Sequence, residues 1–477
     1  MKKMNLLVMS LVSAAALSFS SCSSNDDLTG GAGNQSKVEG FYMTLAVQTP
    51  TSNGTRTQQQ DKKVDATEAE SKVTSGTFYL VNAKGEIVFT KNITEKEWLN
   101  AAPVLTTAGK TQIQVPVQNV TEGETYNVYF LANTTDAKPW ESIYTPPTGF
   151  VGDYATAKKF AMFNQNDKNS RANQYTVTFT TANKDIKIPA QVNKTIMLDR
   201  VTARIDKPTS ETTTINGVLA ADASDLQKKA VADAKGKVKS ITLTNYAITN
   251  LSNKTNIMQK WDNTWASLQI PAGITYMQEA EGLGGKYNIS NAGWFANAEK
   301  NYVFENTEAT PTTMYFEYTV ALDETKFTDT PDCTDGTFYR YNGNIYRSID
   351  GIYAAYADQT VLFGGKTAEA LKAELKINAE GKIGATETEL ANFRQDNVIE
   401  VFVAGKTYYS QVITDHWLGT NTIQRNTVYQ LNVKNIFNVG ADVPNGVPDE
   451  NKPMYYLDVE VSVNPWVLST QDVELGD

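Results

Sequence analysis

The feature that most constrains this chain is an alternation of apolar and polar residues that recurs from about residue 38 onward. The segment "TQIQVPV" (residues 111–117) alternates cleanly, and "TFYLVNAKGEIVFT" (residues 77–90) reads as two strands around a turn. A period of two puts successive side chains on opposite faces of a strand, so that one face can be buried. The pattern therefore predicts a mainly β protein built from antiparallel strands.

Other segments extend this prediction along the chain. Further strands are expected at 124–135, "NQYTVTFTTA", 194–206, "KVKSITLTNYAI", "TTMYFEYTVAL", "VIEVFVAGKTYYSQVI", "TVYQLNVKNI" and "MYYLDVEVSV", and short helices at 154–163, 224–235 and 367–375. Because 41% of the residues are hydrophobic, the chain can fill sizeable cores. We expect two antiparallel β-sandwich domains with a few short surface helices, at residues 57–206 and 207–453, divided where "DKPTSETTTINGV" interrupts the strands.

The N-terminus carries an export pattern. Two lysines precede an apolar run that is too short for a lasting membrane span, and small residues lead to Cys22 in "SFSSC". This predicts a lipoprotein signal peptide at 1–21 and lipidation of Cys22, although Phe19 departs from the usual leucine of a lipobox. The alternative is an ordinary secretory signal. The Gly-rich, acidic segment that follows is typical of a flexible tether.

Composition and motifs exclude several functions. A net charge of -10 and a pI near 5.0 argue against nucleic-acid binding. No Gly-x-Ser-x-Gly, His-Glu-x-x-His or phosphate-binding loop is present, so we expect no enzyme, no cofactor and no metal. The single histidine, His416, has no ligand partner at a suitable spacing, and Tyr154 with Lys158 matches a dehydrogenase pattern by chance. Cys333 has no partner for a disulfide once Cys22 is lipidated.

Two other local features have structural and functional interpretations. The aspartates of residues 329–336 do not have the spacing of an EF-hand, so a turn is predicted, with an adventitious calcium site as the alternative. Trp261 and Trp265 in "WDNTW" are the best candidates for sugar contact, whereas most aromatic residues in a β-sandwich fill its core.

The two ends of the chain share one pattern. In "FYMTLAV" an apolar row predicts a half-buried strand made of Phe41, Met43, Leu45 and Val47. The C-terminal segment shows alternation twice, before and after Pro465. Its apolar residues are Tyr455, Leu457, Val459, Val461, Val463, Trp466, Leu468, Val473 and Leu475. Because proline cannot donate to a strand ladder, we expect Pro465 to interrupt the ladder and to let the last residues move independently.

Between the first strand and the next one lies "QTPTSNGTRTQQQDKK", a polar linker that holds the first arginine of the chain, Arg56. The next arginine is Arg171, although lysines are frequent in between. An extended polar loop is a good protease substrate because its backbone is unpaired. The linker therefore offers one accessible arginine site directly behind a strand, although a merely solvated arginine is the alternative.

The sequence resembles the fimbrillin family, the major subunits of type V pili in Gram-negative oral and gut bacteria. The resemblance covers most of the chain and is carried by the lipoprotein start, "YNVYFLANT", "LDRVTARI", "IQRNTVYQLNVKNI" and "YLDVEVSVNPWVLSTQDVEL", of which the last is the most specific. Residues 250–400 do not match closely. The resemblance implies transthyretin-like, Greek-key domains and a structural role as a stalk subunit.

For this chain the resemblance implies a sequence of events. An outer-membrane lipoprotein precursor is cut by an arginine-specific protease between Arg56 and Thr57, which removes the first strand with the tether (residues 22–56). The C-terminal region 454–477 of another copy then fills the groove, with residues 466–475 as its core. The implied partners are copies of itself, anchor and tip subunits, the protease and, before cleavage, the membrane. The final location is a cell-surface fimbrium that supports adhesion.

Four other interpretations remain open. An anchor subunit would keep its lipid and lack the cleavable arginine, and a tip subunit would lack the C-terminal donor segment. A monomeric surface lipoprotein that binds glycans would present an exposed aromatic platform. A tethered enzyme is the weakest of the alternatives.

Overall fold

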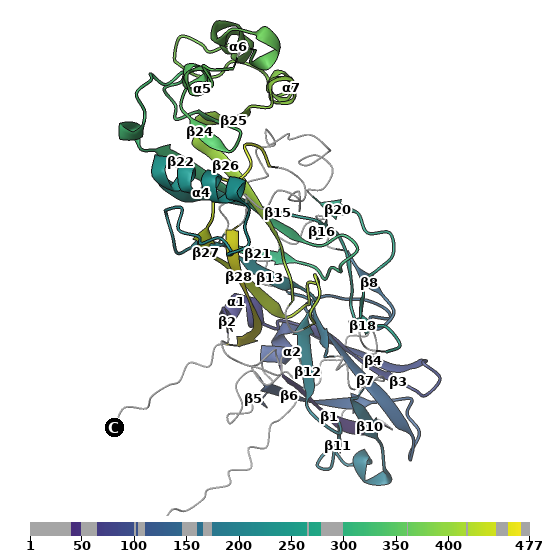
Figure 1. The fold of residues 1–477 in the computed structure, drawn as a ribbon. Coiled ribbons are helices and arrows are strands. Elements are labelled where there is room, and N and C mark those ends of the chain that lie inside the picture. The colour runs from purple at the N-terminus through teal and green to yellow at the C-terminus, as the bar shows by residue number, and fades with distance from the viewer. Residues whose placement is uncertain are drawn as a thin grey trace, which may run out of the picture. The chain divides into compact units, whose positions relative to one another are not determined.

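The computed structural model describes residues 40–48, 64–99, 102–103, 110–145, 160–165, 174–264, 267–277, 299–359, 361–415, 418–444 and 457–468. Strands dominate these residues and helices are few (Figure 1). The chain is therefore mainly β, as the alternation predicted. Among the described residues, no helix is long and apolar enough to span a membrane.

The largest sheet has ten strands and contains the first strand of the chain in its interior. Along its path lie β4 (Ile87–Ile93), β3 (Gly76–Val81), β7 (Thr125–Ala132), β9 (Met162–Asn164), β12 (Ile196–Arg200), β1 (Phe41–Gln48), β6 (Lys110–Val117) and β5 (Ala102–Pro103), with β10 (Thr176–Thr178) beside β7 and β11 (Ala190–Gln191) beside β1. The hairpin predicted at 77–90 is confirmed by β3 and β4, whose turn uses Gly85 at a φ of 81°.

The second sheet has six strands and contains the last described strand. Its path is β2 (Val64–Ala66), β28 (Leu457–Leu468), β27 (Thr427–Ile436), β13 (Ala203–Asp206) and β21 (Lys300–Val303), with β14 (Thr209–Ser210) beside β27. This sheet joins residues from both ends of the chain, because β2 pairs with β28 (Figure 1).

The remaining strands form smaller sheets. They are β15 (Val238–Thr249), β22 (Thr313–Leu322) and β26 (Lys406–Val412); β24 (Asn344–Tyr346), β23 (Phe338–Tyr341) and β25 (Glu400–Phe402); and the pairs β16 (Leu251–Ser252) with β20 (Tyr276–Met277), β17 (Thr255–Asn256) with β8 (Ile143–Tyr144), and β18 (Lys260–Trp261) with β19 (Leu268–Gln269).

The helices are short and mostly capped by a side chain. The α-helices are α1 (Glu68–Ser71), α2 (Glu95–Leu99), α4 (Asp225–Lys237), α5 (Ile349–Ala355), α6 (Ala368–Leu375) and α7 (Glu387–Asn397), and the 3-10 helices are η2 (Thr181–Lys184), η3 (Glu324–Lys326), η4 (Phe363–Gly365) and η5 (Val403–Gly405). Ser224 caps α4 and Thr367 caps α6, so two predicted helices are confirmed. The sequence analysis missed α5 and α7, which pack with β23 and β25 around a small core of their own.

Separate hydrophobic cores lie under these sheets. One extends from β1 to Val201 and also takes in Tyr302, Phe304 and Val428 from the later part of the chain. Another begins at Ala203 and continues to Val439. The described residues, all of which lie from residue 40 onward, belong to one compact unit. The two β-sandwich domains with a boundary near residue 206 stay a prediction.

Four local predictions are wrong. The strand predicted at residues 398–413 is two strands of different sheets, β25 and β26, because the 3-10 helix η5 separates them. The segment 194–206 is two strands in different sheets, β12 and β13, and its apolar positions shift by one residue between them, from even numbers in β12 to odd numbers in β13. The helix predicted at 154–163 is contradicted at its end, where residues 160–161 are not helical and residues 162–163 belong to β9; residues 154–159 lie outside the described residues. The ladder between β27 and β28 does end at Pro465, opposite Thr427, but β28 itself continues to Leu468 and pairs there with β2, so the strand is not divided at Pro465.

Candidate functional site

The candidate site is the groove that holds β1. This strand lies antiparallel to β6 over its whole length, from Phe41 opposite Val117 to Gln48 opposite Lys110. Its other edge pairs in parallel, first with β11 at Met43 and then with β12 at Val47. A strand with neighbours on both edges satisfies its backbone donors and acceptors within the sheet. Without β1, both flanking strands would present unpaired edges.

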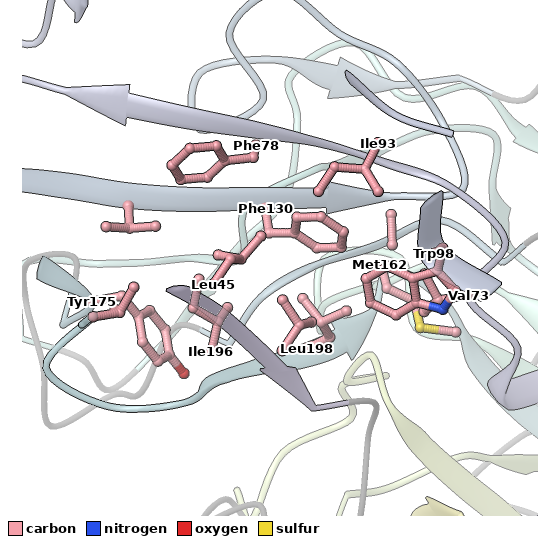
Figure 2. Close-up of a cluster of buried hydrophobic side chains, with 14 of the residues drawn as sticks. Leu45, Val73, Phe78, Ile93, Trp98, Phe130, Met162, Tyr175, Ile196 and Leu198 are labelled. Atoms are coloured by element: carbon pink, nitrogen blue, oxygen red, sulfur yellow. The ribbon is translucent and has the colours of Figure 1, made fainter. Parts of the chain in front are cut away.

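The inner face of β1 fills the core beneath the sheet. Phe41 is 8% exposed, Met43 and Leu45 are 0% exposed and Val47 is 1% exposed, whereas the residues between them are half-buried. Figure 2 shows Leu45 close to Ile196 and Leu198, with Phe130 of β7 facing it. The predicted strand and its apolar row are thus confirmed. Burial of each such side chain contributes roughly 1.5–3 kcal/mol.

One end of the groove is aromatic. The Phe41 ring meets the Phe179 ring edge to face, with centroids 5.4 Å apart, and Phe179 in turn meets Tyr126 at 6.0 Å. Nζ of Lys184, the last residue of η2, lies 5.4 Å from the centroid of the Phe41 ring. The first inward side chain of a strand in this groove therefore packs against an aromatic ring.

The next described segment after β1 consists of β2 and α1. It contains a buried carboxylate, that of Glu70. Glu70 is 2% exposed, and its Oε1 accepts hydrogen bonds from Tyr302 Oη at 2.6 Å and from Lys300 Nζ at 3.0 Å. Arg204 Nη1 donates to both carboxylate oxygens, at 3.2 and 3.3 Å. Thr67 completes a capping box with Glu70 at the start of α1.

Opposing effects set the pKa of Glu70. Burial by itself raises the pKa, but the hydrogen bonds from Tyr302, the Thr67 backbone and Lys300, together with the charge of Arg204, lower it to about 2. The carboxylate is therefore ionised at neutral pH although it lies in the interior.

A fully buried arginine fixes the backbone of the same segment. Arg200 Nε donates to the carbonyl of Glu70 at 2.7 Å, Nη2 donates to Ser71 Oγ at 3.1 Å, and Nη1 donates to Asn426 Oδ1 at 2.9 Å. Burial lowers the pKa of Arg200 to about 9, which still leaves the guanidinium charged at neutral pH. The sequence analysis missed this cluster, although the Thr67-x-x-Glu70 spacing was a visible signal of a capping box.

The C-terminal residues predicted to be donated lie partly in β28. Leu457, Val459, Val461, Val463, Trp466 and Leu468 belong to this strand. It pairs antiparallel with β27 from Ile436 opposite Leu457 to Thr427 opposite Pro465, and then in parallel with β2 over Trp466–Leu468. Tyr455, Val473 and Leu475 lie outside the described residues, as do Cys22, Arg56, Thr57, His416 and the Tyr154–Lys158 pair.

The other candidate residues have structural roles where they are described. Asp332 Oδ2 accepts the Ile349 amide of α5 at 2.7 Å, and Asp335 Oδ1 accepts the Thr337 amide at 3.0 Å, so this segment is the predicted turn. Within the described residues no group of acidic, His or Cys side chains could hold a metal ion. Trp261 is half-buried and donates to Gln259 Oε1 at 3.0 Å, and Trp265 lies outside the described residues.

Residues 400–472 match the family "Major fimbrial subunit protein type IV, Fimbrillin, C-terminal". This match spans β25 to β28 and a few residues beyond. No curated protein matches the chain at a significant level.

Solved structures give weaker likenesses. A candidate cell adhesion protein from Parabacteroides distasonis has 12% identity and a TM-score of 0.43, covering 91% of this chain and 99% of its own. A fimbrilin from Porphyromonas gingivalis W83 has 14% identity and a TM-score of 0.41, covering 90% and 98%. At these values nothing about function follows from them. The match over residues 400–472, which contains β28 and its partner strand β27, confirms the resemblance of this chain to the fimbrillin family.

Proposed function

We propose that this chain is a structural pilin, a stalk subunit of a cell-surface fimbrium that supports adhesion. It is exported as an outer-membrane lipoprotein through Cys22, is activated by an arginine-specific protease after Arg56, and polymerises by strand exchange. In this proposal β1 is a temporary occupant of its groove, and the C-terminal segment of a second copy replaces it. The other partners are the anchor and tip subunits of the same fimbrium.

The observation that carries the proposal is the position of β1 inside the largest sheet. Both of its edges are paired and its apolar row is buried, yet it is joined to β2 by a polar linker that holds Arg56. Cleavage there would leave β1 held by noncovalent contacts alone. Loss of β1 would then create an apolar groove flanked by two open strand edges, which is a template for an added strand.

Strand exchange between copies gives a filament. The groove lies in the N-terminal part of the chain and the donated segment lies at the C-terminus, so the contact joins two different surfaces. Such a heterologous contact repeats from copy to copy instead of closing into a dimer. A paired backbone ladder and several buried apolar side chains would make each joint persistent.

The test uses a chain that begins at residue 23, so that no lipid is attached. Treatment with an arginine-specific protease should convert monomers into ladders that resist SDS without heating. Arg56→Lys is the matched control, because it keeps the positive charge but removes the protease site. Chains that stay monomeric after mass spectrometry has verified a Thr57 N-terminus would refute the stalk function. A variant that ends about ten residues early should be cut normally and form no ladder.

A further inference from the structure

The helices α5, α6 and α7 form a small module with the sheet of β23, β24 and β25 (Figure 1). This module lies in the chain between β22 and β26 and has a hydrophobic core of its own. Within it, a lysine, a glutamate and an asparagine from three separate segments meet. They are Lys366, which directly follows η4, Glu374 of α6 and Asn397, the last residue of α7.

The three side chains form a closed triangle of polar contacts. Lys366 Nζ donates to Asn397 Oδ1 at 3.1 Å and lies 2.8 Å from Glu374 Oε1. Asn397 Nδ2 donates to Glu374 Oε2 at 3.3 Å. The two oxygens of one carboxylate therefore bind the amine of the lysine and the amide nitrogen of the asparagine at the same time.

The fold fixes the members of this triangle. Asn397 is 3% exposed, and its Nδ2 also donates to the Phe393 carbonyl at 2.9 Å. Because Nζ can only donate, while the Glu374 carboxylate and the Phe393 carbonyl can only accept, these contacts determine which side of the amide carries the oxygen. Tyr353 Oη donates to the carbonyl of Lys366 and so holds the lysine backbone. The amine and the amide are thus kept in contact, which gives a reaction between them a high effective concentration.

We propose that Lys366 and Asn397 join in an isopeptide bond, a covalent crosslink that the folded chain forms by itself. Glu374 takes a proton from the Lys366 ammonium, and the lone pair of the freed Nζ attacks Cγ of Asn397. The Nζ–Cγ bond forms and the Cγ–Nδ2 bond breaks. Glu374 passes two protons in total from Nζ to Nδ2, which leaves as an ammonium ion. One ammonium and one primary amide thus give one secondary amide and one ammonium ion, and no further reactant is needed.

A second lysine of the same module provides a comparison. Lys372 of α6 binds two carboxylates, lying 3.4 Å from Asp332 Oδ1 and also in contact with Asp350. An ionised carboxylate is a poor target for an amine because attack would have to expel an oxide. Lys366 instead faces an amide, whose nitrogen becomes a good leaving group once Glu374 protonates it. The arrangement therefore singles out Lys366 for the reaction and leaves Lys372 as an ion pair.

The crosslink would constrain the module. It closes residues 366–397, which contain α6 and α7, into a covalent loop, and loop closure reduces the freedom of the unfolded chain. Within the part of the chain that the structure describes, Cys333 is a free, buried cysteine, so no disulfide provides this constraint there. None of the three reacting residues belongs to the groove of β1, and the inference does not depend on the proposed function.

Mass spectrometry tests the crosslink in the uncut chain that begins at residue 23, purified and kept at 37 °C. The crosslinked chain should weigh about 17 Da less than its sequence requires, because one ammonia is lost. Trypsin does not cleave after a substituted lysine, so a digest of the denatured chain should contain residues 348–372 joined to residues 395–406. A chain that keeps the full mass of its sequence would overturn the proposal.

Two lysine variants separate the crosslink from other losses of ammonia. Lys366→Arg keeps the positive charge and should keep the full mass. An asparagine can also lose ammonia by closing a ring with its own backbone, so a loss of about 17 Da that persists in Lys366→Arg would overturn the crosslink. Lys372→Arg is the matched control in the same module and should lose the same mass as the parent. Full mass in Lys372→Arg would overturn the assignment to Lys366.

Glu374→Gln tests the proton transfer. Glutamine keeps the size of the side chain but does not accept the proton, and general acid–base catalysis typically contributes a factor of about 10²–10⁴. The crosslink should therefore form at least about a hundredfold more slowly than in the parent. The side chain of Glu374 is 38% exposed, so the fold should be kept, and a circular dichroism spectrum checks this. A Glu374→Gln chain that crosslinks at the rate of the parent would overturn the role of Glu374.

Discussion

The strands on either side of Arg56, β1 and β2, are held by different kinds of contact. β1 is long, has two paired edges and buries an apolar row, but no ion pair or covalent crosslink is shown for it within the described residues. β2 is three residues long, and the helix that follows it is tied to three strands by the ionised Glu70 and the buried Arg200. If the chain is cut after Arg56 as proposed, this difference would allow β1 to be replaced while β2 stays, because apolar contacts can be made by another strand whereas the ion pairs of Glu70 need their own partners.

The largest expected effect comes from Glu70, whose ion pairs and hydrogen bonds hold the helix that follows β2. Glu70→Ala should lower the free energy of unfolding by about 3–5 kcal/mol, because Arg204 and the buried Arg200 lose a compensating charge. The change should appear in the precursor and in the processed chain alike, measured by urea unfolding at pH 7. Glu97→Ala is the control: its ion pair with Lys91 is 3.0 Å long but exposed, so less than about 1 kcal/mol is expected. An equal loss in both variants would contradict the special role of Glu70.

A substitution that shortens a buried side chain of β1 should instead lower the stability of the uncut precursor alone. Leu45→Ala is expected to cost about 2–5 kcal/mol in the uncut chain, because it empties space in a closely packed core. After cleavage and loss of β1 the ladders should match those of the parent, since the altered residue is gone. Thr44→Ala, on the half-buried outer face, is the matched control with a small effect. Altered ladders for Leu45→Ala would show that β1 stays in the assembled form.

Low pH should weaken the interactions of Glu70 over a defined pH range. The folded-state pKa of Glu70 is lowered from 4.5 to about 2, so its contribution is fully present above pH 4.5 and is lost as the pH falls toward 2. The loss amounts to about 3 kcal/mol over that range. The difference in unfolding free energy between the parent and Glu70→Gln should therefore shrink from pH 5 to pH 3. A constant difference would mean that Glu70 does not carry the titration.

The smallest effect is expected at the helix cap. Thr67→Ala removes the side-chain oxygen that accepts the Glu70 amide at 3.3 Å, and it should cost about 1 kcal/mol. Thr67→Ser keeps that oxygen and should restore most of the stability, as thermal unfolding would show. If serine fails to restore it, the cap is not what orients Glu70.

The sequence alone predicted much of this architecture. Period-two alternation located the longer strands, including β1 with its buried row, and Ser224 and Thr367 marked the starts of two helices. The fimbrillin resemblance also came from the sequence, and the match over residues 400–472 confirmed it. These features are local: a strand pattern or a helix cap is visible within a few neighbouring residues.

The tertiary structure alone decided which strands became neighbours. β1 lies between β6 and β12, and β2 lies beside β28, because those pairings join residues far apart in the chain. The same holds for Glu70, whose partners Arg204, Lys300 and Tyr302 come from distant segments, and for Pro465, which ends no strand because it faces the first residue of β27. Alternation specifies which face of a strand is buried, but only the packed fold determines what lies beside it.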